Sequence, residues 1–108
     1  MGYDKAEVYL REVIHSVNDG DQMLHMYKSW LAEILVGSAK YAEAETMARQ
    51  ALQTSSGGEA HMWLAMSLLK QGRREEAKGE VQATIRAFGK SISDETYDWL
   101  CKEFGLMP

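Results

Sequence analysis

Apolar residues recur at steps of three and four along almost the whole chain, which is the period of an amphipathic α-helix. The first such stripe consists of Tyr3, Ala6, Leu10, Val13, Ile14 and Val17. Continued along the chain, the pattern predicts about six helices, at 3–18, 22–36, 41–53, 59–70, 74–88 and 93–105. No stretch alternates apolar and polar residues as a strand would, and the only proline, Pro108, is the last residue. The pattern therefore predicts an all-α domain.

Glycine and small polar residues separate the stripes. Gly20 suits a left-handed cap at the end of the first helix, and Asp21 suits the N-cap of the second. Gly72 closes the fourth helix, and Ala39 occupies the corresponding place after the second. The most loop-like run, 54–58, is short enough to join two helices inside one domain.

The chain matches itself at an offset of 33 residues. This offset places Trp30, Leu31, Ala32, Leu35 and Ala44 on Trp63, Leu64, Ala65, Leu68 and Ala77. An offset of 38 places 3–14 on 41–52, and an offset of 36 places 63–64 on 99–100. Two full units, 22–54 and 59–88, are thus flanked by half a unit at 3–18 and a capping half at 93–105. One unit cannot bury its own stripe, so we expect neighbouring units to stack.

This repeat resembles the tetratricopeptide repeat (TPR), a unit of about 34 residues that forms two antiparallel helices. The family's leucine and small residue fall on 31–32 and 64–65, its turn glycine on Gly72, and its crossing alanine on Ala6, Ala44 and Ala77. The early tryptophan slot holds Lys28 and His61 instead, and the closing proline is missing. The resemblance implies a single domain, 1–108, that forms a short right-handed superhelix, with the first helix of each unit lining a concave groove.

On this resemblance, the residues beside the core stripe of the two first helices face the groove and contact a protein partner. They are Met26, Ser29, Trp30, Glu33, Glu59, Met62, Trp63, Met66, Leu69 and Lys70. Tryptophan and flexible methionine side chains suit an amphipathic helix or an extended apolar segment. The alternatives are that this stripe is core, or that it serves self-association. A clamp for a C-terminal carboxylate is not indicated, because no Lys, Arg or Asn occupies the matching slots.

Net charge, cysteine content and hydropathy argue against several functional classes. The net charge of −4 argues against binding nucleic acid through its phosphates, which requires clustered Lys and Arg. The single cysteine, Cys101, allows no internal disulfide and fits a reducing compartment. The N-terminus has no secretory signal, and no apolar run reaches the roughly 18 residues that cross a bilayer. We therefore expect a cytoplasmic protein that does not enter a membrane.

The sequence contains no pattern that indicates catalysis or a cofactor. The histidines are dispersed and lack cysteine neighbours, which argues against a metal site; they are His15, His25 and His61. The pair Gly57–Gly58 is not followed by Lys and Ser or Thr, so it is no phosphate loop. The sequence thus predicts a non-enzymatic scaffold that binds an apolar or amphipathic segment of a partner protein. Two alternatives stay open: a homo-oligomerisation module, and a regulatory or chaperone domain of a larger system.

Overall fold

The computed structural model describes residues 2–18, 20–54 and 58–88, together with positions 98, 102 and 103. These residues form five helices: α1 (Tyr3–Ser16), α2 (Leu24–Gly37), α3 (Tyr41–Thr54), α4 (Gly58–Lys70) and α5 (Arg74–Phe88). No strand occurs in the described part of the chain. The all-α prediction is confirmed, and the first five predicted helices are found within a few residues of their expected bounds. Most of the sixth, predicted at 93–105, lies outside the described residues.

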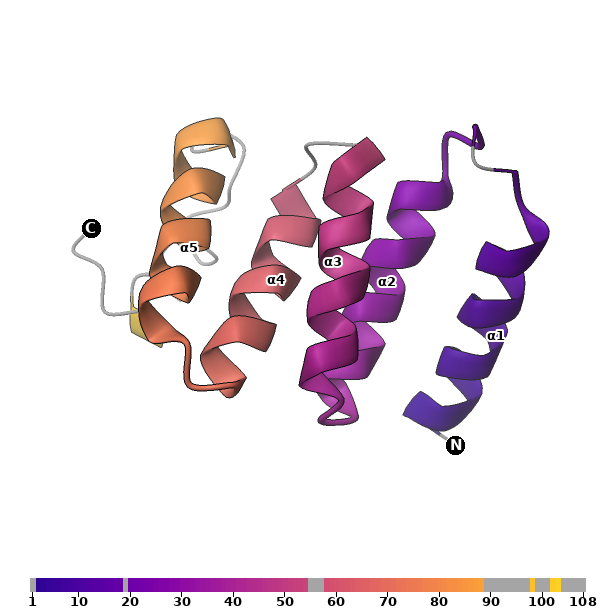
Figure 1. The fold of residues 1–108 in the computed structure, drawn as a ribbon, viewed down its shortest axis with the longest axis horizontal. Coiled ribbons are helices and arrows are strands. Elements are labelled where there is room, and N and C mark those ends of the chain that lie inside the picture. Colours follow the sequence, from indigo (N-terminus) through magenta and orange to yellow (C-terminus); the bar gives the residue numbers. More distant parts are fainter. Residues whose placement is uncertain (1, 19, 55–57, 89–97, 99–101, 104–108) are drawn as a thin grey trace.

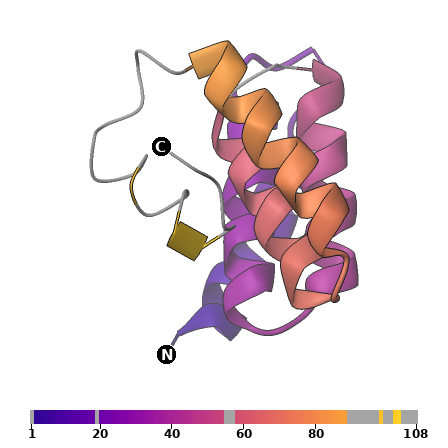
Figure 2. The same ribbon diagram turned by 90° about the vertical axis from the view of Figure 1, so that its left-hand side faces the viewer.

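The helices stand side by side in the order of the sequence, from α1 at one end to α5 at the other (Figure 1). Each helix packs against the next one along the chain, and α2 also packs directly against α4. Viewed from the α5 end, α5 lies in front and the other helices are stacked behind it (Figure 2). Among the described helices, α1 therefore packs closely against α2 alone, with an ion pair from Arg11 to Glu43 of α3 at 3.4 Å, whereas α2 and α4 each pack against three helices.

The turns after α2 and α4 have the same hydrogen bonds at an offset of 33 residues. The amide of Lys40 donates to the carbonyl of Leu35 at 2.8 Å, and the amide of Arg73 donates to the carbonyl of Leu68 at 2.9 Å. The residues before these amides have positive φ, 62° at Ala39 and 81° at Gly72. Both turns are therefore Schellman motifs, and an alanine takes the left-handed conformation in one of them.

The core is built from the residues that the 33-residue offset brings together. Leu31, Leu35, Leu64 and Leu68 are each at most 1 % exposed. The alanines at the helix crossings are completely buried; they are Ala32, Ala44, Ala48, Ala65 and Ala77. Such small residues let neighbouring helix axes approach closely, which is how a short helix buries its leucines against two neighbours. The core consists of two clusters, and Met47 of α3 packs against both.

The segment between α1 and α2 differs from the prediction. Helix α1 ends at Ser16, since Val17 is already extended, and Gly20 does not have the positive φ expected of a left-handed cap. Asp21 is not the N-cap of α2, which begins at Leu24. Its carboxylate accepts a hydrogen bond from the amide of Met23 at 2.7 Å, so it stabilises a turn that precedes the helix.

Candidate functional site

One face of α2 carries exposed apolar side chains. Met23, Met26, Trp30 and Glu33 follow one another at steps of three and four, which places them on one side of the helix. Met23 is 38 % exposed and Trp30 is 36 % exposed, Glu33 is exposed and Met26 is partly buried. The Trp30 ring packs against Tyr27, with 5.8 Å between the ring centroids and 59° between the planes. The apolar part of this face is therefore partly accessible to solvent, and it includes the Trp30 ring, which packs against Tyr27.

The equivalent face of α4 is more enclosed. Trp63, Met66 and Leu69 are partly buried and pack against the core cluster that joins α2, α3, α4 and α5. Met62 is also partly buried, and Lys70 at the end of the helix is exposed. The two tryptophans that the repeat makes equivalent thus differ: Trp63 is partly buried against a core cluster, whereas Trp30 is 36 % exposed and packs against Tyr27.

Two of the predicted contact residues stand apart from this face. Ser29 is only 4 % exposed, so its side chain is not open to a groove. Its hydroxyl has no hydrogen-bond partner among the described residues. Glu59 lies in the first turn of α4, and its side chain is outside the described residues.

Because α2 packs against α4, the remaining predicted residues belong to two adjacent helices. We call them, together with Met23, the α2–α4 surface: Met23, Met26, Trp30 and Glu33 on α2, and Met62, Trp63, Met66, Leu69 and Lys70 on α4. The sequence reasoning left out Met23. The signal for it was available, since it precedes Trp30 by seven residues and so lies on the same helix face.

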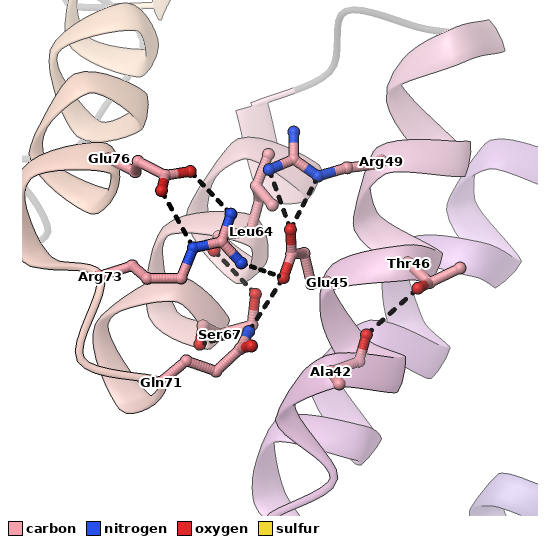
Figure 3. Close-up of polar contacts among 9 residues, drawn as sticks. All are labelled: Ala42, Glu45, Thr46, Arg49, Leu64, Ser67, Gln71, Arg73 and Glu76. Carbon is pink, nitrogen blue, oxygen red and sulfur yellow. Dashed lines mark hydrogen bonds and ion pairs between the residues drawn. The ribbon is translucent and has the colours of Figure 1, made fainter.

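A network of charged side chains joins α3 to the turn between α4 and α5 (Figure 3). The Glu45 carboxylate accepts hydrogen bonds from Arg73 at 2.8 Å, from Gln71 at 3.0 Å and from Arg49 at 3.0 Å. Arg73 also donates two hydrogen bonds to Glu76, at 3.0 Å and 2.7 Å. The Glu45 side chain is only 16 % exposed. Burial alone would raise the pKa of Glu45, but the hydrogen bonds from Gln71 and Arg49 and the charge of Arg73 lower it below its usual value.

A second network repeats this arrangement one unit earlier. The Glu7 carboxylate of α1 accepts hydrogen bonds from Lys40, in the turn between α2 and α3, at 2.8 Å and from Arg11 at 2.9 Å. Its side chain is 12 % exposed, and these hydrogen bonds lower the pKa of Glu7. In both networks a helix carboxylate binds two cations. One is the arginine four residues later, and the other is the Lys or Arg in the turn just before the second helix of the next unit. The networks therefore connect α1 to the turn between α2 and α3, and α3 to the turn between α4 and α5.

These networks were not predicted from the sequence. The repeat itself contained the signal. The offset of 38 places Glu7 and Arg11 on Glu45 and Arg49, and the offset of 33 places Lys40 on Arg73. Charged residues that recur at the same offsets as the core residues indicate contacts between units.

Among the described residues there is no group of three or more His, Cys, Asp or Glu side chains that could hold a metal ion. His61 and Glu80 pair across α4 and α5 at 2.9 Å between Nδ1 and Oε2. Within the same residues, no helix is long and apolar enough to span a bilayer.

We compared the chain with known proteins and found no match among protein-family models, curated proteins or solved structures. The assignment of a family and of a function consequently depends on the repeat and on the surfaces described above.

Proposed function

We propose that this chain is a tetratricopeptide-like scaffold, without enzymatic activity, that binds an apolar or amphipathic segment of another protein on the α2–α4 surface. In this proposal the helices form a short right-handed superhelix, and the protein acts in the cytoplasm. The matching Schellman turns at Ala39 and Gly72 support the repeat, as does the burial of equivalent residues such as Leu35 and Leu68.

The observation that carries the proposed function is the exposure of Trp30. Trp30 is 36 % exposed, and Met23, seven residues earlier on the same side of the helix, is 38 % exposed; both leave apolar area in water that a partner would cover. Tryptophan is enriched among the residues that dominate binding energy, because it buries a large area at a small cost in side-chain entropy. The neighbouring methionines are flexible and adapt to segments of different shape.

The charges around Trp30 indicate which kind of segment fits best. Glu33 is exposed one helical turn after Trp30, and the whole chain carries a net charge of −4. A carboxylate beside an apolar patch favours a segment whose apolar face is flanked by Lys or Arg. We therefore expect basic amphipathic helices to bind more tightly than acidic ones of the same apolar content.

A designed peptide tests this proposal even while the natural partner is unidentified. The probe is a leucine-faced amphipathic helix with flanking lysines, and its control is a scrambled peptide of equal composition. The reporter is the full chain with Trp63→Phe and Trp99→Phe, so that Trp30 is the only tryptophan. We expect the amphipathic peptide to shift the Trp30 emission to the blue and to protect it from a soluble quencher, because the ring moves out of water.

Two further variants, made in the wild-type background, show where the peptide binds. Trp30→Ala should weaken the binding measured by calorimetry by at least about tenfold, as for a central interface tryptophan. Tyr9→Ala, which removes a 65 % exposed aromatic ring from α1, should leave the affinity unchanged. Equal binding of the scrambled peptide, or equal loss in both variants, would exclude the α2–α4 surface as the binding site.

A further inference from the structure

The outward face of α1 is a second exposed apolar surface, separate from α2–α4. Val8 is 57 % exposed and Tyr9 is 65 % exposed, the two largest values among the exposed large apolar residues of the described chain. Helix α1 packs only against α2 among the described helices, and it does so through the opposite side, which carries Leu10 and Ile14. Lys5 and Glu12 lie on the same outward stripe as Val8 and Tyr9, at steps of three and four residues.

The charges on this face are unpaired within the described part of the chain. Glu7 and Arg11, on the flank of α1, pair with each other; Glu7 also pairs with Lys40 in the turn after α2, and Arg11 with Glu43 of α3. Lys5 and Glu12 are both exposed and have no ion-pair partner among the described residues. They are seven residues apart, about 10.5 Å along the helix axis, which is too far for a direct salt bridge within one helix.

The same four residues are complementary to themselves under a two-fold axis. Lys5 and Glu12 are equally distant from the midpoint between Val8 and Tyr9. When two copies of α1 lie antiparallel about this midpoint, Lys5 of each copy is opposite Glu12 of the other. Val8 and Tyr9 of both copies then meet at the centre of the contact. A two-fold interface requires this reciprocity, in which one residue contacts a second and the second contacts the first in return.

We propose that the outward face of α1 pairs with α1 of a second copy of this chain, in an antiparallel two-fold homodimer. The apolar pair Val8 and Tyr9 forms its centre, and two Lys5–Glu12 ion pairs flank it. One short helix per copy offers a small contact area, so the dimer is expected to be weak, with a dissociation constant on the order of 10–100 μM. This inference is independent of the proposed function, because it uses a different helix and none of the α2–α4 residues.

Charge reversal tests the orientation as well as the existence of the dimer. Sedimentation equilibrium on the full chain should show a mass that rises from monomer to dimer with concentration. Lys5→Glu or Glu12→Lys alone places like charges at both ends of the contact and should weaken dimerisation at least about tenfold. The double variant Lys5→Glu with Glu12→Lys recreates both ion pairs with the signs exchanged, so its dimerisation should return close to that of the wild type.

Mixing the two single variants provides a second test in the same instrument. The Lys5→Glu chain carries two acids on the face and the Glu12→Lys chain carries two bases. A mixed dimer therefore has an attractive pair at both ends, although neither variant pairs well with itself. We expect equimolar mixing to produce a heterodimer at concentrations at which each variant alone is monomeric.

Matched controls separate this effect from a general effect of charge. Arg74→Glu and Glu75→Lys change the net charge by the same amounts at exposed positions of α5, and they should leave the dimer unchanged. Circular dichroism of each variant verifies that its helices form. A wild-type chain that stays monomeric up to about 1 mM would overturn the proposal. So would a dimer that tolerates the single reversals, since another surface, including α2–α4, would then hold it together.

Discussion

Ala39 and Gly72 occupy equivalent positions in the turns after α2 and α4. Both positions require a positive φ, which glycine adopts more readily than alanine. Both have positive φ, 62° and 81°, and the amide that follows each of them donates to a carbonyl of the preceding helix. In the left-handed region of φ and ψ, the Cβ of an L-residue approaches a backbone carbonyl, which costs roughly 1–2 kcal/mol, whereas glycine has no such penalty. The repeat holds Ala39 in this conformation because the helices on either side are packed in the core.

Replacing Ala39 with glycine should therefore stabilise the protein. We expect the free energy of unfolding to rise by about 1 kcal/mol, measured by urea denaturation. Gly72→Ala is the reverse change and should lower it by a similar amount. Gly79→Ala, in the middle of α5 with open space around it, should instead raise it by about 0.8 kcal/mol through helix propensity. Destabilisation by Ala39→Gly would show that this turn does not require the left-handed conformation.

At the scale of elements, the ion networks couple α1 to the turn between α2 and α3, and α3 to the turn between α4 and α5. Glu45 illustrates this best, because one carboxylate of α3 contacts Gln71 at the end of α4 and Arg73 before α5. Its side chain is 16 % exposed, whereas that of Glu43, on the same helix, is 57 % exposed. Water screens the interactions of Glu43 much more effectively than those of Glu45.

This difference predicts unequal effects of neutralisation. Glu45→Gln should lower the free energy of unfolding by about 1–2 kcal/mol, because hydrogen bonds to a partly buried charge are lost. Glu43→Gln, which removes the same charge from the same helix, should change it by less than about 0.5 kcal/mol. Urea denaturation of the two variants at neutral pH measures both values. Equal losses would mean that net charge, not the network, determines the effect.

The networks also predict how stability depends on pH. The pKa values of Glu7 and Glu45 are lowered from 4.5 in the folded chain, so near this pH the unfolded chain binds more protons. The stability that these two carboxylates contribute is then fully present above pH 4.5, and it is lost as the pH falls through their lower pKa values in the folded state. The variant Glu7→Gln with Glu45→Gln should show a shallower loss between neutral and acidic pH, measured by urea denaturation at several pH values. A loss as steep as in the wild type would assign the acid sensitivity to other carboxylates.

The elements differ in how far the sequence determines them. The helices and their core leucines were predictable, because Leu31 and Leu64 lie on strong stripes that repeat at a fixed offset. The turn after α1 was not, since Asp21 can cap either a helix or a preceding turn, and a local pattern does not distinguish them. Trp30 and Trp63 have almost the same local pattern but different exposure, because each tryptophan's surroundings depend on the helices packed beside it. The networks at Glu7 and Glu45 depend on which turn lies beside which helix. A local sequence pattern does not specify this tertiary arrangement.

At the scale of the whole molecule, the helices form a row in which stability should decrease toward the α1 end. Helix α1 packs closely against α2 alone among the described helices, with one ion pair to α3, and it contributes one buried residue, Leu10, which is 8 % exposed. Helix α4 contacts three neighbours and contains Leu64 and Leu68, each 1 % exposed. In a stack whose units interact only with their neighbours, an end helix with one contact opens at a lower free energy than an inner one.

Native-state hydrogen exchange measures this gradient directly. At low protein concentration the α1 amides should exchange through openings of lower free energy than those of α4. Leu10→Ala should lower the protection of α1 and leave that of α4 nearly unchanged, because α1 can separate while the inner helices stay packed. Leu64→Ala should instead lower the protection of α3, α4 and α5 together, by about 2–5 kcal/mol, since it empties the shared core. If Leu10→Ala reduced protection equally in α1 and α4, the row would unfold as one cooperative unit. A rise in α1 protection at high concentration, absent in Lys5→Glu, would connect this end helix with its proposed pairing.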